Sequence, residues 1–301
     1  MELTDMTALA RKLLNTTYNL AMGPNTYNDN SVFARVLEGA FRRDYLTLYT
    51  MLYLIEHSEP AQRRAFGDCC LDLSRKVLED LVSLEYMLLK GKEPYAKKFF
   101  DYYHIEAKRD SDFLEAAGTP IDQERKLVIE KNYNGVKRDF FDSGSRTRQR
   151  AWSELTEFLV AQNKIDQQTK QQIEDEFNRR YPNVNEQPRK AWAGLDTEAM
   201  IETLVQHDVI NADEQKILIQ TYIQGNNKNH FSPTDVLAFL RIDPYNIVSD
   251  SNLELSLVST TTAVARIATI FANEFDIPEA TKQAIDEIGQ TLRAAHLPEE
   301  E

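Results

Sequence analysis

The chain has 301 residues, of which 42% are apolar and 28% charged, a balance typical of a globular protein and not of a disordered or fibrous one. Its net charge of −13 argues against non-specific nucleic-acid binding over the whole surface, because such a field repels phosphate. Only 10 Gly and 10 Pro interrupt the chain, which favours long helices over short strands joined by tight turns.

Neither a targeting segment nor a membrane span is expected. The first residues, MELTDMTALARKLL, carry acidic side chains and lack the apolar run of a signal peptide. The best candidate span, 71–89, is interrupted by charges, and we identify no uninterrupted apolar stretch of roughly 18 residues. Cys69 and Cys70 are neighbours on a predicted helix and are poorly placed to bridge each other, so both are expected to be small buried hydrophobes. Together these features predict a cytoplasmic protein in a reducing compartment.

Apolar residues recur at helical spacing along nearly the whole chain, and turn residues mark the ends of the helices. Ser31 is placed to cap a helix that runs to His57, Pro60 lies in the first turn of the next, and Gly91 closes that one. No segment alternates as a strand. Helices are expected over 3–22, 31–57, 60–90, 95–117, 121–141, 147–162, 166–181, 196–207, 211–226, 232–240, 252–274 and 278–296.

The composition shifts in the middle of the chain. Residues 142–190 are rich in Gln, Asn, Arg and Glu and contain two polar helical segments between loops. We interpret them as an exposed polar helical hairpin inserted between two parts of one core, 1–141 and 191–301. The sequence therefore predicts an all-α, multi-helix bundle of at least nine helices with this insertion.

The helix over 71–89 is apolar around most of its circumference and is predicted to be central, with Leu78, Leu81, Val82 and Leu88 buried. On the same helix Asp72, Arg75 and Glu79 share one face. They are interpreted either as a buried polar group that holds a ligand or as an ordinary ion pair on a half-exposed helix.

The next helix carries Tyr102, Glu106 and Arg109 on one face. A Tyr hydroxyl beside Glu and Arg could bind a polar ligand, or these could be amphipathic core residues with their polar tips satisfied. Because the turn near Gly91 is short, we expect the two helices to be antiparallel neighbours and two Arg–Glu pairs, Arg75–Glu79 and Glu106–Arg109, to interlock between them.

A third candidate is His230, which ends the polar loop GNNKNH just before the predicted helix start at Ser232. A helix N-terminus attracts anions, and a histidine there could act as a base or contact a phosphate, although loop histidines are commonly just solvated. The five histidines have no zinc-ligand spacing, and no standard catalytic or nucleotide-binding motif occurs. No metal and no cofactor are predicted.

These residues resemble a known pattern. Arg75 and Glu79, the run YYHIEAKRD ending in Asp110, Trp192-Ala-Gly, and Tyr222 followed by His230 and Ser232 resemble an uncharacterised bacterial all-helical family, domain of unknown function 5677. The resemblance covers about 65–275 and implies Arg75, Glu79, Glu106, Arg109, Trp192 and His230 as signature positions. The helices are also similar to those of the HEPN group, which includes ribonucleases, but the Arg–x₄₋₆–His spacing of those enzymes is missing.

Two functions are consistent with this pattern. The first is an all-α binding or accessory protein, in line with a role in a bacterial defence or stress system. The alternative is a HEPN-like ribonuclease or nucleotide-processing toxin with Arg75, Glu79 and His230 at its site. Candidate ligand-binding residues are Arg75, Glu79, Tyr102, Glu106, Arg109 and His230. The expected partner is a protein or a small ligand rather than nucleic acid or a membrane, and a homodimer stays open.

Overall fold

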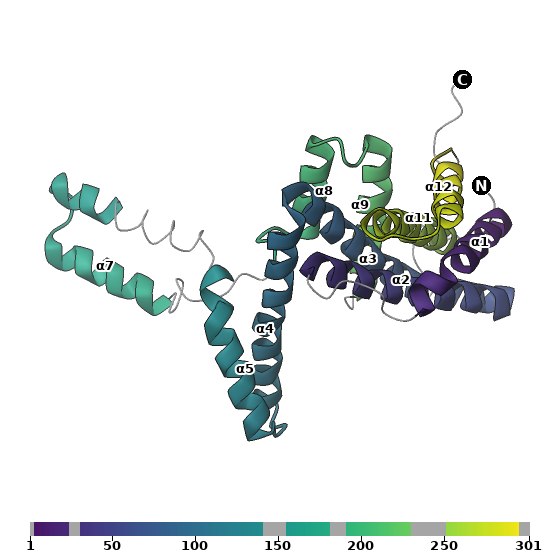
Figure 1. Ribbon diagram of the computed structural model, residues 1–301. Helices are drawn as coiled ribbons and strands as arrows, with labels where there is room; N and C mark the ends of the chain where they lie inside the picture. The colour runs from purple at the N-terminus through teal and green to yellow at the C-terminus, as the bar shows by residue number, and fades with distance from the viewer. Residues whose placement is uncertain (1–2, 24–30, 141–154, 181–190, 230–250, 295–301) are drawn as a thin grey trace. The chain divides into compact units, whose positions relative to one another are not determined.

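The computed structural model describes residues 3–23, 31–140, 155–180, 191–229 and 251–294 (Figure 1). Within these ranges the regular structure is helical and no strand occurs, which confirms an all-α fold of at least nine helices. The helices are α1 (Leu3–Met22), α2 (Val32–His57), α3 (Pro60–Lys90), α4 (Lys92–Ala116), α5 (Gln123–Val136), the 3-10 helix η1 (Lys137–Phe140), α7 (Gln167–Arg180), α8 (Thr197–Gln206), α9 (Ala212–Asn229), α11 (Ser251–Glu274) and α12 (Glu279–Ala294).

The boundaries follow the local signals in the sequence. The Ser31 side chain accepts a hydrogen bond from the backbone N–H of Ala34 (3.0 Å) and so caps α2. Pro60 begins α3, and Gly91 separates α3 from α4 with a φ of 114°, a left-handed value that favours glycine. The predicted helix over 232–240 lies outside the described residues.

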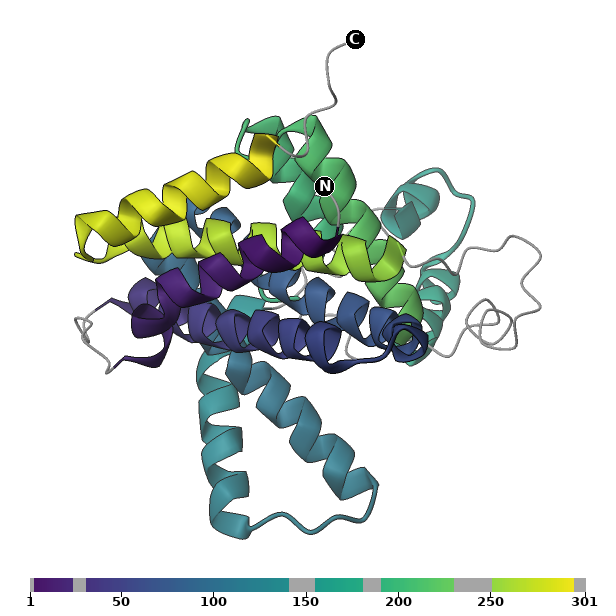
Figure 2. The same ribbon diagram turned by 90° about the vertical axis from the view of Figure 1, so that its right-hand side faces the viewer.

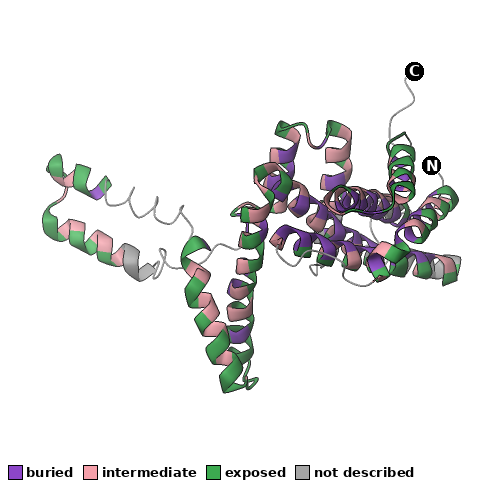
Figure 3. Ribbon diagram, viewed as in Figure 1, coloured by how far each residue is buried: buried purple, intermediate pink, exposed green. Residues whose placement is uncertain are grey.

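The chain divides into two compact units, which we describe separately. One consists of Met1–Ala96 with Thr197–Glu301, and the other of Lys97–Asp196. The sequence boundaries were placed at 141 and 190, whereas this division assigns most of α4 and all of α5 to the second unit. In that unit the polar hairpin of 155–161 and α7 is largely exposed (Figure 3).

The core of the first unit is built on α3 and α11, which pack against each other most extensively, with α2 and α9 beside them. Figure 2 shows α1 and α12 on the outside of this group. Leu78, Leu81 and Val82 on α3 are buried, as predicted. The burial predicted for Leu88 is wrong, because 40% of this residue is exposed at the last turn of α3.

The choice of 71–89 as the best candidate span is also wrong. Among the described helices, α11 is long and apolar enough over Leu253–Glu274 to cross a membrane, yet 72% of that stretch is buried within the protein. Such burial is typical of a core helix. Its apolar character comes from Leu, Val, Ile, Phe and Ala side chains, between which Ser and Thr residues are interspersed.

Small hydroxyl residues line the seam between the central helices. The Ser74 hydroxyl on α3 lies 3.0 Å from the carbonyl oxygen of Ser256 and accepts a hydrogen bond from Thr260 (2.8 Å). Thr221 on α9 and Ser259 on α11 share another hydrogen bond of 2.8 Å. These three hydrogen bonds give the buried hydroxyl groups partners and let the helices approach closely.

The two cysteines differ in their surroundings. Cys70 is fully buried, and burial raises the pKa of its thiol to about 12. Cys69 is exposed, which corrects the expectation that both are buried. The reason is geometric, because adjacent residues on a helix point about 100° apart and only one of them can face the core.

Asp44 on α2 is the most deeply buried acidic side chain of the described core, with 1% of its surface exposed. Neither carboxylate oxygen has a hydrogen-bond partner in the described part of the chain. The nearest guanidinium nitrogen, Nε of Arg43, lies 3.7 Å from Oδ1, and the same Arg43 also pairs with Asp80 on α3. A buried carboxyl that accepts no hydrogen bond favours its protonated form.

Candidate functional site

The structure brings together one of the predicted sets on α3 and α9. Nε of Arg75 donates to Oε1 of Glu79 (3.0 Å), and the Arg75 guanidinium lies 5.6 Å from the centre of the Tyr222 ring on α9. The approach of the two helices depends on Gly225, because a Cβ at this position would lie 2.8 Å from the Arg75 Cβ. Both charged side chains keep contact with solvent, so this i,i+4 pair contributes only a few tenths of a kcal/mol.

The second predicted set lies on the part of α4 that belongs to the second unit. Nη1 of Arg109 donates to the Tyr102 hydroxyl (2.9 Å), and the ring of Tyr102 packs edge-on against Phe140 at 5.3 Å. Glu106 is exposed on the same helix. Tyr102 therefore has a packed ring and a hydrogen-bonded hydroxyl, as in the interpretation of this set as amphipathic residues with satisfied polar tips.

The predicted interlocking of the Arg75–Glu79 and Glu106–Arg109 pairs joins residues of the two units, and it stays a prediction from the sequence. His230 lies outside the described residues, as does Ser232. The described residues therefore bring together Arg75, Glu79 and Tyr222 within the first unit, and Tyr102 with Arg109 within the second.

A third cluster, centred on Arg266 of α11, was missed by the sequence analysis. Nη2 of Arg266 lies 2.7 Å from Oε1 of Glu85 on α3 and 3.2 Å from the carbonyl oxygen of Val209. Nη1 lies 3.0 Å from Oε1 of Glu214 on α9. Arg266 thus ties α11 to two other helices through charge-assisted hydrogen bonds.

Glu214 is itself fixed by the start of α9. The Asn211 side chain accepts a hydrogen bond from the Glu214 N–H (2.9 Å), and Oε2 of Glu214 accepts one from the Asn211 N–H (3.0 Å). This reciprocal arrangement is a capping box. Because Glu214 uses one oxygen for the cap and the other for Arg266, the position of the guanidinium is determined by local sequence as well as by packing.

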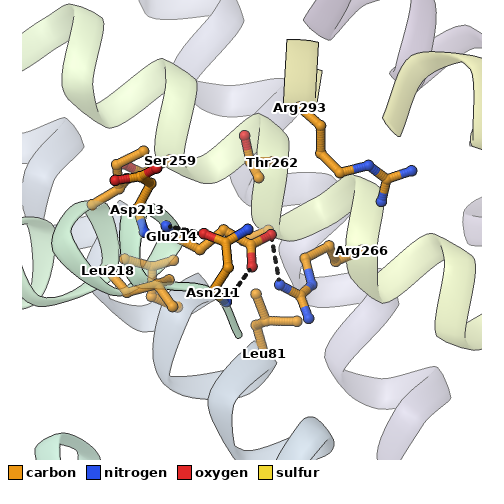
Figure 4. Close-up of a pocket in the computed structure, with 12 residues that line it drawn as sticks. Leu81, Asn211, Asp213, Glu214, Leu218, Ser259, Thr262, Arg266 and Arg293 are labelled. Atoms are coloured by element: carbon orange, nitrogen blue, oxygen red, sulfur yellow. Dashed lines mark hydrogen bonds and ion pairs between the residues drawn. The ribbon is translucent and has the colours of Figure 1, made fainter. Parts of the chain in front are cut away.

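Next to this cluster is a cavity of about 250 Å³ (Figure 4). Its walls come from α3, α9, α11 and α12 and are mainly aliphatic. The Thr262 hydroxyl is buried beside it and has no hydrogen-bond partner among the described residues. A smaller hollow of about 70 Å³ shares Thr262, Arg266 and Arg293 with it. The apolar wall residues are Leu78, Leu81, Ile217, Leu218 and Ala263.

Arg293 on α12 supplies a second guanidinium at the cavity. It is exposed and forms no ion pair within the described part of the chain, in contrast to Arg266. The cavity therefore combines apolar walls with the Thr262 hydroxyl and the Arg293 guanidinium. The carboxylates of Asp213 and Glu214 also line it, but Asp213 pairs with Lys216 and Glu214 with Arg266. Within the described ranges no three His, Cys, Asp or Glu side chains are grouped so that they could hold a metal ion.

A comparison of the chain with models of known protein families, with curated protein sequences and with solved structures finds no match. The resemblance to the helical families noted above accordingly stays an expectation.

One sequence signal could have indicated this site. Arg266 is the only charged residue between Glu254 and Glu274 on a long apolar helix. A lone charge in such a position must find partners when the helix is buried, so its surroundings are a natural place to look for a polar cluster. Its partners, Glu85 and Glu214, are distant in sequence and have no recognisable spacing.

Proposed function

We propose that this chain is a non-enzymatic all-α binding protein whose ligand is a small, mainly apolar molecule with one anionic group. The observation that carries the proposal is the cavity between α3, α9, α11 and α12, with its aliphatic walls and with Arg293 beside it, which forms no ion pair with the described residues. Ligand sites of this kind combine apolar walls with a few polar groups that orient the ligand.

The chemistry of the walls supports this ligand class. Leu78, Leu81 and Leu218 would contact the apolar part of the ligand, since removing apolar surface from water is favourable by about 25 cal/mol per Å². Arg293 would pair with the anionic group. Arg266 is engaged by two carboxylates and acts as a support for the walls rather than as a ligand contact. The volume, slightly below the roughly 300 Å³ of drug-sized sites, suits a small ligand.

The biological setting of this proposal is an accessory or sensor role in a bacterial defence or stress system. Its support is the resemblance noted from the sequence. The ribonuclease alternative depends on His230, and nothing among the described residues favours it over ligand binding.

Octanoate and octanol are suitable probes, because they share an apolar chain and differ in charge. We expect both to bind the full chain in isothermal titration calorimetry, with octanoate the tighter of the two. Arg293→Gln should weaken octanoate about tenfold, the equivalent of about 1.4 kcal/mol, and leave octanol unchanged. Ala263→Leu, which places a larger side chain in the cavity, should abolish binding of both.

Arg35→Gln is the matched control, because Arg35 is an exposed arginine on α2 without an ion pair among the described residues and does not line the cavity. It should bind both probes as the unaltered chain does. Circular dichroism melting would check that Ala263→Leu still folds. Absence of binding by either probe, or normal binding by a folded Ala263→Leu variant, would overturn the proposal.

A further inference from the structure

The second unit contains a groove that its own side chains do not fill. It has a volume of about 750 Å³ and lies between α4 and α5, which stand apart near the loop of 117–122 in the view of Figure 2. On both helices, residues three or four positions apart line the groove. Its apolar lining includes Tyr103, Ala107, Leu114, Ile121, Val128 and Ile129.

The apolar face of α5 is left uncovered by the described residues of its own unit. None of its 14 residues is buried. Leu127 is 66% exposed and Val128 51%, and on α4 Phe113 is 74% exposed. Isolated helices shorter than about 12–15 residues are marginal in water, and most helices in proteins depend on packing of an apolar face. Burial of this face would therefore stabilise α5.

The charges of this segment indicate what covers it. Residues 97–140, which hold most of α4 with α5 and η1, carry nine Lys or Arg and nine Asp or Glu, whereas the whole chain has a net charge of −13. Two copies of the chain repel each other over most of their surface, but not through this neutral segment. Its neutrality also provides no attraction for a strongly charged partner, which favours a second copy over an acidic or basic peptide.

We propose that residues 97–140 form a homodimer interface, in which the α4–α5 pairs of two copies pack together about a two-fold axis as a four-helix bundle. In such an interface each copy contributes the same patch, so the exposed apolar face of one copy is buried against that of the other. Helices of the partner fill the groove, and Leu127, Val128 and Tyr103 become buried. This inference is independent of the ligand cavity, which lies in the first unit.

The test is the mass of the full chain in solution, measured by light scattering after size-exclusion chromatography. The unaltered chain should have twice the single-chain mass of 34.7 kDa. Leu127→Lys and Val128→Lys, which place a charge on the apolar face of α5, should give the single-chain mass. Leu46→Lys is the control, because Leu46 on α2 is an exposed leucine (49%) outside the segment, and this variant should stay dimeric.

Hydrogen exchange of 123–136 provides a second measurement that requires no variant. Its amides should exchange more slowly as the concentration of the unaltered chain rises, because dimer formation protects α5. A single-chain mass at all concentrations would overturn the proposal. So would a dimer that both lysine variants leave intact, since its interface would then lie elsewhere.

Discussion

Replacing Asp44 with asparagine is expected to raise the free energy of unfolding at pH 8 by several kcal/mol more than at pH 4. Burial raises the pKa of the Asp44 carboxyl from 3.8 to about 8, and the attraction of Arg43 only partly opposes this. The folded state therefore keeps a proton that the unfolded state loses. The contribution of Asp44 to the free energy of unfolding is fully present below its pKa in the unfolded state. It is lost as the pH rises toward its pKa in the folded state, by about 1.4 kcal/mol per pH unit.

The difference between the unaltered chain and Asp44→Asn isolates this contribution, because the other titrating groups are common to both. Urea unfolding at intervals between pH 4 and pH 8 would measure it. Asp44→Leu should remove the same pH dependence and add stability at every pH, since it also removes the polar atoms. Asp276→Asn, at an exposed position, should leave the pH dependence unchanged. Parallel curves for Asp44→Asn and the unaltered chain would show that Asp44 is ionised in the folded protein.

Leu81→Ala is expected to lower the free energy of unfolding by roughly 2–5 kcal/mol. Leu81 is 1% exposed between the central helices and also borders the cavity beside Arg266, so truncation leaves a void continuous with an existing one. Leu88→Ala makes the same chemical change on the same helix at a position that is 40% exposed, and should cost less than about 1 kcal/mol.

Urea unfolding of the two variants at one pH compares them directly. Equal losses of stability would contradict the assignment of Leu81 to the core and Leu88 to the surface. A change below about 0.5 kcal/mol for Leu81→Ala would place this face of α3 at the surface.

The two leucines also show how far the sequence predicts this fold. Leu88 follows Leu81 by seven residues and therefore has nearly the same helical phase, so periodicity assigns both to the core. The predicted helical phase is correct, but the sequence of α3 alone does not show how far along this face the covering helices extend. Helix boundaries were predicted better, because Ser31, Pro60 and Gly91 act through backbone conformation within a few residues.

The candidate site was harder to predict for a related reason. The Arg75–Glu79 pair lies within one helical turn and is visible in the sequence. The Arg266 cluster joins residues 181 and 52 positions apart, and only the packing of three helices brings them together. A cavity is harder still to predict from the sequence, because the leucines that line it have the same helical spacing as leucines in a filled core. What the sequence does show is that Arg266 interrupts an otherwise apolar helix.

That interruption has a consequence for the synthesis of the protein. By length and composition alone, α11 could cross a membrane before it packs into the core. Arg266 lies near the middle of this segment, where a charged side chain costs about 2.5–3.5 kcal/mol on the scale for bilayer insertion. Within the fold, Glu85 and Glu214 offset that cost. The same guanidinium that joins three helices in the finished protein therefore biases the nascent chain away from the lipid phase and toward its own core.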